Sequence, residues 1–217
     1  MKKFYLKEPG SAITHFIGFL LSIIAGIPLL IKASQQSNYI YIISLSDFFV
    51  SIILLYAAST LYHSLDISEK GNQRLKKFDH IMISVLIAGT YTPICLISVK
   101  GKIGISLLSI VWGFALLGIV IKVFWVNCPK WISSVLYIAM GWTCVLAFSK
   151  VYSALPSAAF WWLLIGGIIY TVGGVIYALK VQFLDRLHKY FGLHEIFHLF
   201  IMGGSFCHFI FMFLYVA

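Results

Sequence analysis

Seven long apolar runs dominate this sequence and restrict the folds that are open to it. They cover residues 13–31, 40–62, 79–98, 103–124, 131–148, 160–179 and 195–216. A helix needs about 20 apolar residues to cross the hydrocarbon of a bilayer. Of the 217 residues, 61% are hydrophobic and 11% are charged, whereas soluble domains carry roughly a quarter charged residues. The pattern predicts an all-α membrane protein, a seven-transmembrane helix bundle formed by a single domain over residues 1–217.

The basic residues indicate how such a bundle is oriented. If the N-terminus lies inside, 12 of the 16 lysines and arginines fall in inside segments and four fall outside. Because inside loops carry the excess of Lys and Arg, we predict an N-in, C-out topology in the plasma membrane. The net charge of +9 then reflects this bias and contact with anionic lipids. A nucleic-acid partner is disfavoured, because no soluble basic domain exists to bind one. The basic segment 180–191 is expected to lie along the inner interface or to form a solvated loop.

Polar side chains from distant parts of the sequence fall at one end of the predicted bundle. His63 ends the second run, Asp79 begins the third, and His194 and His198 lie in the first two turns of the last. Antiparallel neighbours bring these positions to one depth, near the inner membrane surface. Positions four apart differ by about 40° around a helix axis, so Ser59 shares a face with His63, and His194 with His198. Polar residues at such a depth are functional candidates.

Three histidines form the predicted metal site. A histidine pair at i, i+4 suits a bound metal, and three protein ligands with one open position are typical of a catalytic zinc site. We therefore predict that His63, His194 and His198 bind Zn²⁺. Asp79 is assigned a catalytic role, because a carboxylate there can orient a ligand or take a proton from water. Ser59 is assigned to hold a substrate carbonyl or the water.

Other residues near this site have more than one interpretation. Glu195 completes the motif HExxH, which is typical of a protease base. It stands at the entry of its helix, where it can instead face the helix dipole. His15 is a rival third or fourth ligand, and Glu8 lies near the same depth as a candidate to support the ligands. Asp79 can also be a simple cap of the third helix.

Two further features are assigned to packing. His208 lies ten residues after His198, which places it about 15 Å deeper along the helix, too far to share a metal with the pair. The sixth run carries four glycines that suit close helix packing. They are Gly166, Gly167, Gly173 and Gly174.

Several short motifs together resemble the hemolysin III proteins, and the resemblance covers essentially the whole chain. The motifs are residues 8–15 (EPGSAITH), 58–63 (ASTLYH), 79–80 (DH), 194–198 (HEIFH) and 207–209 (CHF). The hemolysin III proteins are the bacterial branch of the progestin and adipoQ receptor superfamily, which includes the adiponectin receptors and is distantly similar to alkaline ceramidases.

The resemblance implies both a site and a range of activities. It implies an N-in, C-out seven-helix bundle with zinc near the inner face, held by the histidines that match His63, His194 and His198. Ser59 and Asp79 match the family's accompanying serine and aspartate. In the receptor branch this site is associated with slow ceramide hydrolysis. The bacterial branch was named for haemolytic activity and is also linked to membrane lipid balance.

Three functions are weighed on this basis. The first is a zinc-dependent hydrolase of a ceramide-like amide or ester lipid, with membrane lipids as partners and an acyl lipid as substrate. The second is a cytolysin that permeabilises membranes, although the sequence offers no soluble pre-pore form. The third is a sensor or receptor of membrane state in which zinc is purely structural. An intramembrane protease ranks below the lipid hydrolase.

Overall fold

The computed structural model describes residues 6–181, 184 and 190–217, which are folded almost entirely into helices. These residues hold seven helices long and apolar enough to cross a membrane, which confirms the predicted fold class. Most of the segment 180–191 lies outside the described residues. In chain order the elements are α1 (Pro9–Ser34), α2 (Tyr39–Ser64), α3 (Glu69–Pro93), η1 (Ile94–Val99), α4 (Gly101–Phe124), α5 (Lys130–Gly141), η2 (Trp142–Ala147), α6 (Phe148–Ala154), α7 (Ser157–Leu179), α8 (Leu193–Phe211) and η4 (Met212–Val216).

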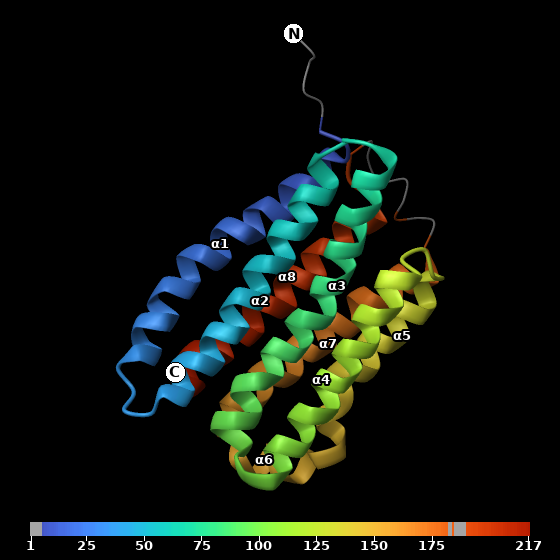
Figure 1. Ribbon diagram of the computed structural model, residues 1–217. Helices are drawn as coiled ribbons and strands as arrows, with labels where there is room; N and C mark the ends of the chain where they lie inside the picture. Colours follow the sequence, from blue (N-terminus) through green and yellow to red (C-terminus); the bar gives the residue numbers. More distant parts are fainter. Residues whose placement is uncertain (1–5, 182–183, 185–189) are drawn as a thin grey trace.

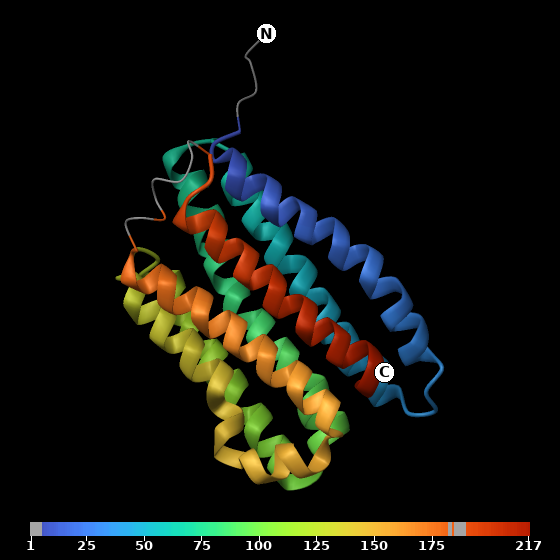
Figure 2. The ribbon, with the colours of Figure 1, turned by 180° about the vertical axis from the view of Figure 1, so that it is seen from behind.

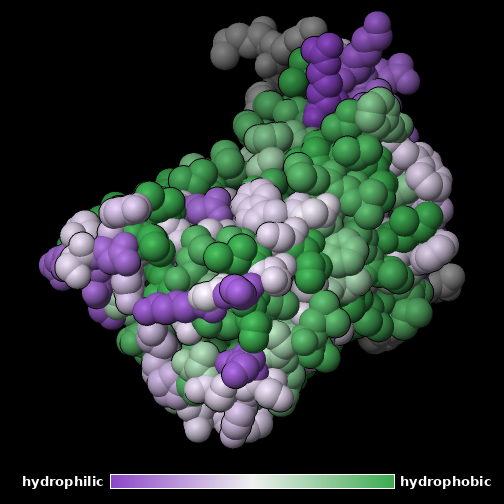
Figure 3. Space-filling view, turned by 60° about the horizontal axis from the view of Figure 1, so that its bottom comes forward, coloured by the Kyte–Doolittle hydropathy of each residue, from purple (hydrophilic) through white to green (hydrophobic). Residues whose placement is uncertain are grey.

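The helices form one bundle of antiparallel neighbours (Figures 1 and 2). Helix α1 packs on α2, α2 on α3 and α3 on α4, while α7 packs on both α5 and α8. The contact between α1 and α8 joins the two ends of the chain. One end of the bundle carries the starts of α1, α3, α5 and α8 and the ends of α2, α4 and α7; we call it the N-terminal end. Figure 3 shows a broad apolar flank between hydrophilic side chains at the two ends, as a bilayer requires.

The third helix begins well before its apolar run. It starts at Glu69, ten residues ahead of the predicted start, and the Ser68 side chain caps it by accepting a hydrogen bond from the Gly71 N–H at 3.2 Å. Asp79 therefore lies in the third turn of α3 and is buried. The interpretation of Asp79 as a helix cap is wrong, because the charged turns before it are also helical.

The fifth span is interrupted, although its apolar run is continuous. Helix α5 ends at Gly141, a 3₁₀ turn follows, and α6 completes the span to Ala154. The Tyr91 hydroxyl of α3 enters the break. It donates to the Gly141 carbonyl at 2.6 Å and accepts from the Cys144 N–H at 3.0 Å. A break in a lipid-embedded helix needs such partners for the freed backbone groups.

The glycines of α7 divide into two kinds. A Cβ atom on Gly173 would lie 2.5 Å from Phe200 Cβ, and one on Gly166 would lie 2.8 Å from His208 Nε2. These two positions therefore allow α8 to approach closely, as predicted. A Cβ on Gly167 would meet nothing within 4 Å, and one on Gly174 would make only ordinary contact with Ile138. The close contact of α7 with α8 thus depends on alternate glycines rather than on all four.

We expect Gly173→Ala to destabilise the protein by about 1–3 kcal/mol, because the added methyl overpacks the α7–α8 contact. Gly167→Ala is the matched control in the same helix, and its methyl should be tolerated or slightly stabilising. Thermal unfolding of both variants in detergent measures the difference. Equal melting temperatures would contradict this account of the contact.

Candidate metal centre

Three histidines from two helices converge at the N-terminal end of the bundle. His63 comes from the last turn of α2, and His194 and His198 come from the first two turns of α8. The ligand nitrogens of all three lie within 4.8 Å of one another. His63 and His198 are buried and His194 is half-buried. The structure therefore brings together the three residues that the sequence predicted as ligands, and they could hold a metal ion.

The spacing of the nitrogens suits a small tetrahedral ion. The Nε2 atoms of His63 and His194 are 3.2 Å apart. Zn–N distances of about 2.0–2.1 Å in a tetrahedron separate two ligand nitrogens by about 3.3 Å. The ligand nitrogens of all three histidines lie within 4.8 Å of one another, so a small adjustment of the rings brings the third nitrogen to a similar spacing.

The residue just before α1 holds the ligand from α2. The Glu8 carboxylate accepts a hydrogen bond from His63 Nδ1, and the Glu8 N–H donates to the His63 carbonyl at 2.9 Å. The hydrogen bond to His63 lowers the pKa of Glu8 below its ordinary value, against the effect of partial burial. An ionised carboxylate only accepts, so we infer that His63 carries its proton on Nδ1. Its Nε2 lone pair is then presented to the other two histidines.

The same helix holds a ligand from α8. The Thr14 hydroxyl lies 3.0 Å from His198 Nδ1 and 3.0 Å from the carbonyls of Gly10 and Ser11. Carbonyls only accept, so the single hydroxyl proton goes to one of them and Thr14 accepts from His198 Nδ1–H. His198 is thereby left with its Nε2 free for a metal. Orienting partners of this kind fix the tautomer of a ligating imidazole.

Glu195 has a structural position rather than that of a protease base. One carboxylate oxygen accepts from the Ser11 hydroxyl, and the other accepts from the Gly192 N–H at 2.9 Å, at the start of α8. Both oxygens are thus engaged in joining α8 to α1 and in capping α8. This geometry favours the reading of Glu195 as a first-turn acidic residue over the HExxH reading.

His15 lies beside the group without joining it. Its ring stacks on that of His198, with centroids 3.4 Å apart and planes 10° apart, and it is not among the residues whose ligand atoms converge. A ring stacked in parallel directs its nitrogens alongside its neighbour rather than at a shared point. The rival assignment of His15 as a ligand is therefore not supported by the geometry.

Asp79 and Ser59 lie next to the histidines. Both are buried, Asp79 at 7% exposure and Ser59 at 1%. The Asp79 carboxylate is close enough to His63 and Ser59 to interact with each, yet the Ser59 hydroxyl finds no hydrogen-bond partner of ordinary geometry in the described part of the chain. A buried unpaired hydroxyl is costly. It is therefore available to a ligand in the site.

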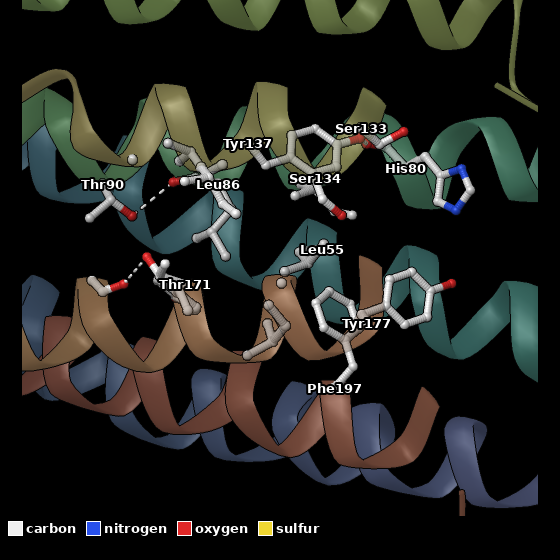
Figure 4. A pocket seen from close by; sticks show the side chains of 18 of the residues that line it. Leu55, His80, Leu86, Thr90, Ser133, Ser134, Tyr137, Thr171, Tyr177 and Phe197 are labelled. Carbon is white, nitrogen blue, oxygen red and sulfur yellow. Dashed lines mark hydrogen bonds between the residues drawn. The ribbon is translucent and has the colours of Figure 1, made fainter. Parts of the chain in front are cut away.

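A cavity of about 880 Å³ adjoins these residues and extends into the bundle. His63, His194 and Asp79 form part of its wall, while Leu86 and Phe160 line it farther in. Figure 4 looks into this cavity between α3 and α5 on one side and α7 and α8 on the other. Its lining is mostly apolar. The site is thus a polar group at one end of a chamber suited to a hydrocarbon chain.

Sequence reasoning missed Thr14 and the pairing of Ser11 with Glu195. A signal was available, because Glu8, Ser11 and Thr14 follow one another at three-residue spacing and so lie near one face of α1. Nothing in that pattern names a partner, since the partners belong to α2 and α8.

In the described part of the chain, seven helices able to span a membrane and a histidine group at one end of them define a multi-pass membrane protein with a candidate metal site. A family model described as haemolysin-III related matches residues 4–209. The chain is 43% identical to the hemolysin-3 homolog of Bacillus subtilis over 92% of its own length and 89% of the relative's. It is 39% identical to hemolysin-3 of Bacillus cereus, over 94% and 90%. The chain belongs to the haemolysin-III related family and is a protein of the bacterial plasma membrane.

A more distant similarity reaches animal receptors. The adiponectin receptor protein of Drosophila melanogaster is 24% identical over 93% of this chain and 49% of the receptor. The resemblance to the progestin and adipoQ receptor superfamily is thereby confirmed.

We expect metal content to depend on the converging histidines and not on the stacked one. His63→Ala and His194→Ala should each remove most bound metal, because two imidazoles are a poor site. His15→Ala should retain it. Elemental analysis of the purified variants tests this, and equal metal in all three would refute the ligand assignment.

We also expect Glu8→Gln to weaken metal binding by about 10- to 100-fold, because it removes the charged acceptor that orients His63. Glu69→Gln is the matched control, since Glu69 is an exposed acid at the same end of the bundle. Competition with a chelator measures both affinities, and loss of affinity in both variants alike would point to general electrostatics instead.

Proposed function

We propose that this protein is a zinc-dependent hydrolase of acyl lipids that acts in membrane lipid balance. The observation that carries the proposal is the histidine group, with Asp79 and Ser59, at one end of a mostly apolar cavity inside a membrane-embedded bundle. Three imidazoles with an open position are typical of catalytic zinc, whereas structural sites are usually closed by four protein ligands. Imidazole nitrogens suit zinc among the common metals.

The residues of the chain divide the work of the proposed reaction. Bound zinc supplies Lewis acidity, which polarises a carbonyl and makes water a nucleophile near neutral pH. Asp79 takes the proton from the attacking water and passes it to the leaving nitrogen or oxygen. The Ser59 hydroxyl donates to the carbonyl oxygen as negative charge develops on it. Glu8 and Thr14 keep His63 and His198 in the required tautomer.

The cavity favours a lipid as the substrate. Its mostly apolar wall continues from the histidines past Leu86 to Phe160, so an acyl chain can lie within the bundle while its amide or ester carbonyl stays at the polar end. Burial of the chain also excludes water from all but the reacting end.

We infer that the site faces the cytoplasm. The N-terminal end of the bundle carries most of the basic residues, as the positive-inside rule predicts for the cytoplasmic side. Labelling single cysteines placed in the α1–α2 and α2–α3 loops of intact cells tests this orientation. Reagents that do not cross the membrane should reach only the α1–α2 loop.

We expect Asp79→Asn to reduce fatty-acid release from acyl lipids by about 10²- to 10⁴-fold, because it removes a general base, while zinc content stays close to that of the wild type. Asp66→Asn is the matched control, an exposed carboxylate at the same end of the bundle. Release of fatty acid from a panel of amide and ester lipids, measured by mass spectrometry, gives the rates.

The same preparation separates the alternatives. Dye leakage from liposomes that survives removal of the metal, with no lipid turnover, would support a cytolysin and overturn the hydrolase. Bound zinc with neither turnover nor leakage would support a sensor of membrane state.

A further inference from the structure

A second polar cluster lies on the wall of the same cavity, beside the histidine group. Lys122, in the last turn of α4, is only 3% exposed. Its ammonium donates to the Ser133 hydroxyl at 2.5 Å and to the Cys128 thiol at 3.1 Å. No carboxylate pairs with it among residues 6–181, 184 and 190–217. A buried charge inside a membrane protein normally has a counter-charge or marks a ligand site.

The neighbours of Lys122 add further donors. Lys76 donates to the Asn127 side chain at 2.8 Å, and it is close enough to Lys122 for their charges to repel. His80, which is also within reach of both charges, has a buried Nδ1 with no partner in the described part of the chain. All of these side chains line the cavity. Figure 4 shows His80 and Ser133 toward the same end of the view as Tyr177, with Thr90 and Thr171 toward the other.

The negative groups nearby do not neutralise this cluster. The Glu8 carboxylate attracts the Lys76 ammonium through its charge. That carboxylate already accepts a hydrogen bond from His63 Nδ1. The Cys128 thiol is the other acidic group in contact. Burial would raise its pKa, but the hydrogen bonds from Ser133 and Lys122 lower it below the ordinary value. Even an ionised Cys128 offsets only one of the two ammonium charges, so the cluster keeps an excess of positive charge on the wall of the cavity.

We propose that Lys122, Lys76 and His80 form a subsite for a phosphate group at the N-terminal end of the cavity. A phosphate oxygen accepts charge-assisted hydrogen bonds of the kind these side chains supply. Free phosphate and the headgroup of an anionic phospholipid share this chemistry.

The order of residues along α3 favours the lipid. Lys76, Asp79 and Leu86 all line the cavity, one turn and then two turns apart. Along α3, a charged side chain (Lys76) is therefore followed by a catalytic one (Asp79) and then by an apolar one (Leu86), from the N-terminal end toward the interior of the bundle. In a glycerophospholipid the phosphate, the ester carbonyls and the acyl chains follow in the same order. The subsite therefore indicates an anionic phospholipid as the substrate. Its link to catalysis rests on the proposed function.

The test measures binding without turnover. The metal-loaded protein in neutral detergent is titrated with a dialkyl ether phosphatidylglycerol, which has no acyl bond to hydrolyse, and with the dialkyl glycerol that lacks the phosphate. Native mass spectrometry gives the bound fraction of each. Lys122→Gln should weaken binding of the ether phosphatidylglycerol by about tenfold, the loss of one hydrogen bond to a charged group, and should leave binding of the dialkyl glycerol unchanged.

Two further variants guard the interpretation. Arg74→Gln removes a charge from an exposed position at the same end of the bundle and should change binding less than twofold. Lys122→Arg keeps the charge and should retain binding. If Lys122→Gln does not fold, as judged by gel filtration and thermal unfolding, Lys76→Gln takes its place.

The outcomes are distinct. Wild-type binding by Lys122→Gln, or equal losses in Lys122→Gln and Arg74→Gln, would overturn the subsite. If inorganic phosphate displaces the lipid only from protein that contains Lys122, the two ligands share the same site. If phosphate binds tightly and the protein shows no preference between the two ether lipids, the subsite belongs to free phosphate. Because nothing is hydrolysed, this result stands whether or not fatty-acid release from acyl lipids succeeds.

Discussion

The buried imidazoles of His63 and His198 each have one nitrogen held by a hydrogen-bond partner, and these two bonds organise the N-terminal end of the protein. His63 and His198 are almost fully buried, and an unpaired polar group in such a position is costly. The start of α1 supplies one partner to each, through its N-cap residue Glu8 and through Thr14 in its second turn. The remaining nitrogens are then directed at one another, an arrangement that a metal ion would satisfy.

The same contacts explain how the bundle closes. Helix α1 is joined to α2 through Glu8 and to α8 through Thr14 and the Ser11–Glu195 hydrogen bond. The first helix thus holds the second and the last in register at the end where the histidines meet. At the other side of the cavity, the Tyr91 hydroxyl satisfies the broken backbone of the fifth span. Hydrogen bonds therefore fix the positions of the helices at the site, and apolar packing holds the remainder of the bundle together.

Much of the candidate site was predictable because hydropathy and charge determine depth. The seven apolar runs corresponded to seven spans, and the depth of His63, His194 and His198 followed from the order of the helices. The errors were local. The third helix began earlier than its apolar run, because charged residues such as Glu69 continue a helix beyond the hydrocarbon. The break after Gly141 was not expected from the apolar run, and the hydroxyl that satisfies its freed backbone groups comes from another helix.

The sequence by itself determined which segments cross the membrane and at what depth each polar side chain lies, since both depend on transfer of single residues between water and lipid. Only the tertiary structure decided which side chains face one another. In the structure His15 stacks beside the converging histidines without joining them, Glu195 caps the start of α8, and Lys122 lines the cavity. Rotation of a helix about its axis is set by packing against neighbours far away in the sequence, and no local pattern encodes those neighbours.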